Sequence, residues 1–187
     1  MAGLRGVPDA PRYATSQSFP AGEEDLMTTE QFADVLRGIP LVVSVVTVGR
    51  GGADNALTVS WAAPVAFDPP HFMIAVDQHH YSVDFLKSTR NFTVNVLREG
   101  QERLAGRFAR QSMTQEDKLD AVPVREGETG AAILTDALAY FDCELVSASV
   151  VGDHLLVVGR VVDAGVLNGG RPMQTSAGLR YQKASPA

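Results

Sequence analysis

"NALTVSWAAPVAFDPP", residues Asn55 to Pro70, begins as a strand and ends on two consecutive prolines. Apolar and polar side chains alternate as far as Val59, which is typical of a β-strand with two different faces. Each proline removes a backbone donor, so we expect the chain beyond Trp61 to leave its ladder on an extended, unpaired path. Bulges re-aim strands, and we therefore predict a break in regular pairing from Ser60 to Ala62.

Other strand-like runs lie on both sides of this stretch. They are rich in β-branched and aromatic residues and cover 41–48, 71–77, 91–97 and 139–167, the last folded back at Gly152 and Asp153. Short helices are expected at 28–38, which opens with a Thr28 to Gln31 capping box, after Ser82, and at 100–111, whereas 112–130 reads as a polar loop. Short strands without βαβ alternation predict a mainly β fold, an antiparallel barrel with a few flanking helices.

Composition limits the classes of protein and partner. The 187 residues suit one domain, 28–187, preceded by a flexible N-terminal arm, 1–27, rich in Pro, Gly, Ala and Ser. A net charge of -6 argues against nucleic acid or an anionic membrane as a partner. The single cysteine, Cys143, cannot form an intrachain disulfide and reads as a small core residue. Without an apolar stretch typical of a signal peptide or a spanning helix, we expect a cytoplasmic protein.

Several polar residues have both a structural and a functional interpretation. A serine such as Ser82 before a helix is usually a cap, although the same free N–H groups can bind phosphate. Lys118 reads as a solvated charge or as a phosphate-binding cation, with Arg90 as a second candidate. His154 follows a tight turn, so it should stand at a barrel rim.

Two acidic or histidine-containing clusters are interpreted as structural. His79 and His80 beside Asp77 match no metal-binding spacing, so no metal is expected. Asp142 and Glu144 lie two residues apart on one strand, and a solvated outer face explains them without a catalytic carboxylate pair.

Taken together with the opening stretch, three further segments carry a family resemblance: "YSVDFLKSTRNFTVNVL" at 81–97, "EDKL" at 116–119 and "GDHLLVVGRV" at 152–161. In this order they resemble the flavin reductase-like family of FMN-binding split barrels, from about Phe32 to Val162. The resemblance implies a homodimer of Greek-key split barrels that binds FMN or FAD and reduces it with NADH or NADPH. Many relatives supply reduced flavin to a separate monooxygenase.

The resemblance also implies site residues. Flavin would lie along the opening stretch and its proline bend, and a lysine and the start of a helix would hold it. The residues implied are Asn55, Ala56, Thr58, Val59, Ser60, Trp61, Asp68, Pro69, Tyr81, Ser82 and Lys118. Tyr181 would pack over the ring, and His154 would orient nicotinamide. Leu119 stands where the family has an aromatic residue, and the ending "PMQTSAGLRY" departs from the usual motif.

Two other functions remain open. One is a flavoprotein that keeps its FMN and passes electrons to another acceptor. The other is a flavin-binding split barrel without turnover. Reduced flavin carries negative charge near its polar edge, and fixed donors there would stabilise the reduced state.

Overall fold

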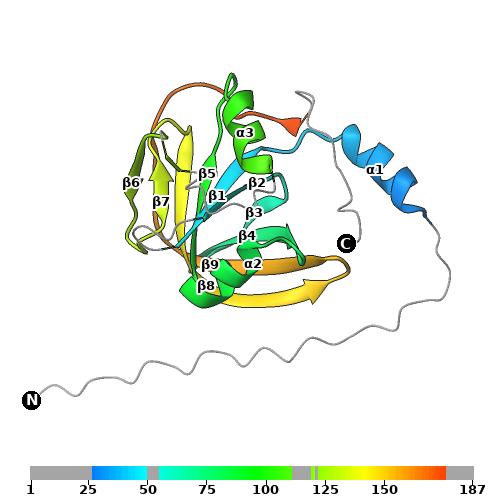
Figure 1. Cartoon of the computed structure of the whole chain (residues 1–187), viewed down its shortest axis with the longest axis horizontal. Helices are drawn as coiled ribbons and strands as arrows, with labels where there is room; N and C mark the ends of the chain where they lie inside the picture. The colour runs from blue at the N-terminus through cyan, green and yellow to red at the C-terminus, as the bar shows by residue number, and fades with distance from the viewer. Residues whose placement is uncertain (1–26, 50–54, 111–118, 121, 176–187) are drawn as a thin grey trace, which may run out of the picture.

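The computed structural model describes residues 27–49, 55–110, 119, 120 and 122–175 (Figure 1). Its main feature is one sheet of seven strands in the order β2-β1-β5-β8-β9-β4-β3, paired antiparallel throughout. These strands are β1 (Ser44–Val48), β2 (Asn55–Val59), β3 (Ala62–Phe67), β4 (Pro70–Asp77), β5 (Asn91–Val96), β8 (Ala139–Val151) and β9 (His154–Val166). A separate two-stranded sheet pairs β6 (Val124–Glu126) with β7 (Ala132–Leu134).

The sheet curves into a barrel with one open corner. β2 and β3 stand at opposite ends of the strand order, yet only Ser60 and Trp61 separate them in the chain. The two edges must therefore meet at this corner, and the Ala75 N–H of β4 donates to the Trp61 carbonyl at 2.9 Å, which continues the β3–β4 ladder up to the corner. The predicted break in pairing between Ser60 and Ala62 is confirmed.

The core has two parts that share the central strands. Inside the barrel, fully buried side chains such as Val46, Ile74 and Phe92 pack together. On the other side of β1 and β2, Val45 and Ala56 pack beneath Phe108 of α3. β1 is buried on both faces, so its sequence SVVTV shows no strict alternation of apolar and polar residues.

Three helices flank the sheet: α1 (Thr29–Arg37), α2 (Ser82–Thr89) and α3 (Glu102–Ala109). The capping box between Thr28 and Gln31 is confirmed at the start of α1. The hairpin between β8 and β9 is confirmed as well, since Val151 pairs with His154 and leaves Gly152 and Asp153 as the two turn residues. Gly152 has φ 58, a backbone region that glycine adopts without steric cost.

Two segments predicted to be irregular are strands. Residues 62–67 form β3, which pairs with β4, so the expectation of an unpaired path beyond Trp61 is wrong. Pro64 is tolerated because β3 is an edge strand, where the missing N–H faces no partner strand, and the register shifts just after it. The predicted polar loop 112–130 contains β6, which gains its regularity by pairing with β7.

The prediction that Asp142 and Glu144 share a solvated face is wrong. A register shift just after Asp142 turns the two carboxylates apart. Asp142 is fully buried and accepts hydrogen bonds from the hydroxyls of Thr93 (2.8 Å) and Thr129 (2.6 Å) and from the Thr129 N–H (2.9 Å). Glu144 is exposed and pairs with Arg160. Asp142 therefore fastens the loop between β6 and β7 to the barrel.

Cys143 is a buried core residue, as predicted. Burial and, to a smaller extent, the neighbouring Asp142 carboxylate together raise the pKa of its thiol to about 12. The thiol therefore stays protonated and unreactive at neutral pH.

Candidate functional site

A large cleft lies at the open corner of the barrel. Its volume is about 1340 Å³, and its walls come from the ends of β2 and β4, the turn between β8 and β9, the end of α3, and α1. Five of the predicted site residues line it: Thr58, Val59, Ser60, Trp61 and His154. The tertiary structure thus brings together the end of the second strand and the histidine of the last hairpin.

β2 turns unpaired backbone groups toward this cleft, because it is an edge strand with β1 on one side only. The Ala56 N–H bonds the side-chain oxygen of Asn55 at 2.7 Å and not β1. By the alternation of an antiparallel ladder, the N–H group of Thr58 also points away from β1. Such fixed donors suit the polar edge of a planar ring that carries negative charge.

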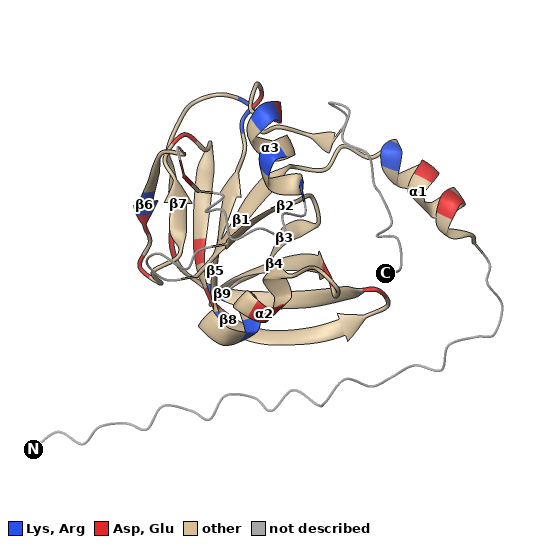
Figure 2. Cartoon of the chain, viewed as in Figure 1, with Lys and Arg blue, Asp and Glu red and all other residues tan. Residues whose placement is uncertain are grey.

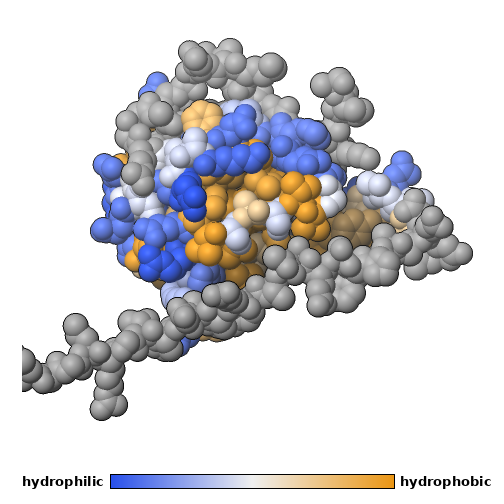
Figure 3. Space-filling model, turned by 90° about the horizontal axis from the view of Figure 1, so that it is seen from below, coloured by the Kyte–Doolittle hydropathy of each residue, from blue (hydrophilic) through white to orange (hydrophobic). Residues whose placement is uncertain are grey.

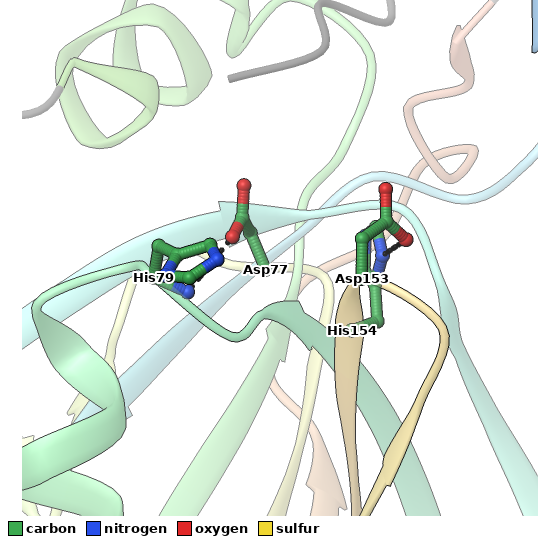
Figure 4. Close-up of polar contacts among 4 residues, drawn as sticks. All are labelled: Asp77, His79, Asp153 and His154. Carbon is green, nitrogen blue, oxygen red and sulfur yellow. Dashed lines mark hydrogen bonds and ion pairs between the residues drawn. The ribbon is translucent and has the colours of Figure 1, made fainter. Parts of the chain in front are cut away.

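Two rings form one wall of the cleft. The Trp61 and His154 ring centroids lie 4.6 Å apart with an interplanar angle of 35°. His154 Nδ1 lies 2.6 Å from the Asp153 carboxylate, and the His154 side chain is 26% exposed. Figure 4 shows His154 beside Asp153, with Asp77 and His79 across from them. An aromatic surface of this kind can stack on another flat ring.

Thr58 ties the cleft to α3. Its hydroxyl donates to the Ala105 carbonyl of α3 at 2.7 Å. Phe108 and Ala109, near the end of α3, line the same cleft. The β2 edge and α3 are therefore held as one rigid wall.

Asn55 and Tyr81 position the start of α2 next to β2. The Tyr81 hydroxyl donates to the Asn55 side-chain oxygen at 2.8 Å. Tyr81 is the N-cap of α2 and has helical dihedrals, φ -57 and ψ -24, without a side-chain cap hydrogen bond. Asn55 and Ala56 are buried, so they support the wall of the cleft from behind.

Ser82 is not the helix cap predicted from the sequence, because it is the first residue inside α2. Its side chain is fully buried, and its Oγ has no hydrogen-bond partner among the residues that the structure describes. A buried hydroxyl of this kind usually finds a partner. Ser82 does not line the cleft, but it lies at a helix N-terminus, where N–H groups favour anions such as a phosphate.

His80 is a residue that sequence reasoning interpreted only as part of a metal-free loop. It lines the cleft, and its Nδ1 accepts the Ser82 N–H at 3.2 Å. Its ring also lies 4.6 Å from that of Tyr81. Its spacing before Ser82 could have indicated a role at the start of the helix.

Other predicted residues do not gather at the cleft. Asp68 and Pro69 are exposed in the turn between β3 and β4, about 20 Å from Trp61 along a six-residue strand. Arg90 is exposed at the other end of α2, where it is the C-cap with φ 57. Lys118 and Tyr181 lie outside the described residues, as does the predicted arm 1–27 apart from Met27.

The described part of the chain contains neither a candidate metal cluster nor a helix suited to a membrane. No group of three or more His, Cys, Asp or Glu residues there could hold a metal ion. No described helix is both long and apolar enough to cross a membrane. The absence of a metal and the cytoplasmic location remain predictions.

The seven-stranded sheet with one open corner and a cleft at that corner defines an antiparallel split barrel. Residues 36–183 match the family model described as "Flavin reductase like domain", and the chain belongs to this family. The resemblance inferred from the sequence motifs is thereby confirmed.

Relatives with known names and solved structures agree with this family. The chain is 31% identical over 143 residues to the flavin reductase (NADH) of Kitasatospora aureofaciens, covering 75% of this chain and 73% of the relative. It is 30% identical over 123 residues to diflavin flavoprotein A 1 of Synechocystis sp., covering 65% of this chain but only 22% of that longer protein. The structure of the NADH:FAD oxidoreductase SgcE6 of Streptomyces globisporus C-1027 is similar, with a TM-score of 0.77, 30% identity, and coverage of 89% of this chain and 99% of that one.

Proposed function

We propose that the chain is an NAD(P)H-dependent flavin reductase, which transfers hydride from NADH or NADPH to FMN or FAD. The observation that carries this proposal is the Trp61–His154 ring pair beside the open edge of β2, in one cleft. This wall offers aromatic stacking and fixed N–H donors together, as the two edges of a flavin and a nicotinamide require. The named NADH-dependent reductases among the relatives support the same activity.

The residues divide the work of binding. When bound, the flavin accepts a hydride from reduced nicotinamide and passes the electrons on. The N–H groups of Thr58 and Ser60 would donate to its polar edge, and the Ser82 hydroxyl with the first N–H groups of α2 would hold its phosphate. Lys118 would add a cation there. Asp68, Pro69 and Tyr181 remain predicted flavin contacts that no observation supports so far.

His154 would orient the nicotinamide. Hydride transfer needs close stacking and little water at the reacting carbon, and it needs no proton donor at that position. Trp61 backs the His154 ring, and Asp153 fixes it from the side through the 2.6 Å contact. His154 therefore holds the ring of the reductant in place.

One assay tests the proposal. The purified chain is mixed with NADH or NADPH and catalytic FMN or FAD, and the loss of nicotinamide absorbance is followed. We expect turnover that rises with the concentration of added free flavin. A protein with no flavin affinity and no turnover would leave only the structural split barrel and would refute the proposal.

A second candidate function is electron transfer by a flavin that stays bound. The match to a diflavin flavoprotein and the structural likeness to an FMN-binding protein of Thermus thermophilus, with a TM-score of 0.64 and 26% identity, favour it. In this case flavin would co-elute with the protein in gel filtration. NADH oxidation would then depend on a second electron acceptor and not on free flavin.

Partners follow from the same proposal. One similar structure is BorF, the flavin reductase component of a bacterial two-component tryptophan halogenase, with a TM-score of 0.74 and 27% identity. For this chain we propose a flavin-dependent monooxygenase as the enzyme that receives reduced flavin. Oxygen-dependent product formation by a candidate monooxygenase, with this chain as the only source of reduced flavin, would test the pairing.

We also propose a homodimer. β8 and β9 carry exposed valines, Val146, Val150, Val151, Val162 and Val166, and Figure 3 shows apolar residues gathered on the face seen from below. Apolar surface of this kind favours association with another protein surface. Light scattering should give a dimer for the wild type and a monomer for Val150→Lys. Val124→Lys, on β6 and also exposed, is the control that should stay dimeric.

A further inference from the structure

α1 carries all the local signals of a helix and yet buries nothing. Its capping box joins Thr28 and Gln31, and Asp34 pairs with Arg37 one turn apart. Figure 2 shows the acidic residues along α1 and the arginine at its end. None of its residues is buried. Because isolated helices of this length are marginal in water, α1 needs a surface to pack against.

α1 lines the cleft with both apolar and charged side chains. Phe32, Ala33 and Leu36 line it beside Glu30, Asp34 and Arg37, with Trp61 and His154 on the other walls. Phe32 is 49% exposed, so half of its surface is open to an occupant. Val35 is 57% exposed and is not part of the cleft lining. Neighbouring apolar residues of one short helix thus differ in whether they face the site.

α1 is attached to the barrel at one end only among the described contacts. The chain after it is fixed by Thr175, whose hydroxyl accepts the Leu41 N–H at 3.1 Å and donates to the Ile39 carbonyl at 3.3 Å. Val42 forms a bridge with Gln174. Between helix and anchor lie Gly38, the C-cap, and Pro40. The helix is therefore tethered at the mouth of the cleft without being packed on the core.

We propose that α1 is the outer wall of the nicotinamide–flavin site and that Phe32 and Leu36 pack against the bound rings. The proposal rests on the proposed reductase function. Its occupant follows from the cleft: the wall opposite presents the rings of Trp61 and His154, and a flat ring can lie between this wall and the apolar side of α1. α1 would thus contribute affinity and exclude water, and it would gain the packing that it lacks.

Two matched variants test the contact. Phe32→Gln removes an apolar side chain from the cleft lining, and Val35→Gln makes a similar change one turn away from it. The dissociation constant of NAD⁺ for flavin-loaded protein, measured by titration, should rise roughly five- to tenfold for Phe32→Gln, as expected for half of a phenylalanine side chain. Val35→Gln should leave it unchanged within about twofold. Equal effects of the two variants would overturn the proposal.

Hydrogen exchange gives an independent readout. The amides of Thr29–Arg37 should exchange more slowly in wild-type protein with FMN or FAD and NAD⁺ than in ligand-free protein. The same ligands should protect these amides less in Phe32→Gln. Unchanged exchange in the presence of saturating ligands would overturn the proposal.

Light scattering separates the remaining alternative, a second copy of the chain covering α1. If Phe32→Gln and Val35→Gln both reduce the mass of the particle and lower NAD⁺ affinity together, α1 packs on the partner copy and the proposal is wrong. Wild-type turnover with free flavin is measured in parallel. Its absence refutes the reductase itself, whereas normal turnover with equal variants refutes only the role of α1.

Discussion

Replacing Ser82 with alanine should stabilise the ligand-free protein and weaken its affinity for flavin nucleotides. The Ser82 hydroxyl is fully buried and has no partner, a situation that costs about 1–3 kcal/mol. Removing it should raise the free energy of unfolding by about 1 kcal/mol, a melting-temperature increase of roughly 2–4 °C for a chain of this size. If the hydroxyl donates to a phosphate, its loss should weaken binding roughly 10- to 150-fold.

Ser88→Ala is the matched control on the same helix. Ser88 is exposed, and its hydroxyl donates to the Phe85 carbonyl at 3.0 Å. Both variants gain the same small helix propensity from alanine, about 0.5 kcal/mol, and Ser88→Ala also loses this exposed hydrogen bond, so Ser82→Ala should be the more stable of the two. Thermal unfolding without ligand measures the change in stability of each variant.

Quenching of flavin fluorescence measures the affinity of each variant for FMN and for riboflavin, which lacks the phosphate. Ser82→Ala should weaken FMN binding and leave riboflavin binding unchanged. Two results would refute the reasoning: a lower melting temperature for ligand-free Ser82→Ala than for Ser88→Ala, or equal losses of affinity for FMN and riboflavin.

Three more predictions follow from particular contacts. His154→Ala should slow nicotinamide oxidation about tenfold, because a ring contact is lost, whereas Lys118→Ala should mainly weaken flavin binding. Stopped-flow kinetics measures the first effect and flavin titration the second, and the reverse pattern would contradict both roles. Gly159→Ala should lower the free energy of unfolding by about 1–3 kcal/mol, because its new Cβ would lie 2.7 Å from ring atoms of a buried phenylalanine. Gly106→Ala in α3, where a Cβ meets open space, should raise the free energy of unfolding by about 1 kcal/mol. Chemical denaturation would contradict this prediction if both changes had the same sign. Burial raises the pKa of the Cys143 thiol to about 12, so this thiol should react with a thiol reagent at pH 8 only after denaturation, and rapid labelling of native protein would contradict the prediction. The thiol of the unfolded chain ionises near about pH 8.5. The contribution of Cys143 to the free energy of unfolding should therefore be complete below that pH and fall as the pH rises toward the pKa of the folded state.

The strands and turns could be predicted because their causes are local. β-branched runs favour extended backbone wherever they lie, and a glycine before Asp153 supplies the positive φ that a two-residue turn needs. The capping box of α1 involves only residues three apart in the chain. The motifs that revealed the family are likewise short and contiguous.

Where the sequence interpretation failed, a distant contact had changed the local outcome. Pro64 lies in a paired strand because β3 is at the edge of the sheet, and edge position depends on all seven strands. Ser82 lost the cap position because the Tyr81 hydroxyl bonds Asn55 of β2 and Tyr81 itself takes the N-cap. Asp142 turned inward because of a register shift between β8 and β9.

The amino-acid sequence by itself determined most of the strands and helices, though not β3 and β6, and the family to which the chain belongs, because these depend on neighbouring residues and short patterns. Only the tertiary structure decided that Trp61 and His154 stack, that β2 leaves an open edge, and that α1 faces the same cleft. Contacts between residues far apart in the chain depend on how the sheet curves and closes, and the free energy of that closure is shared among all its strands.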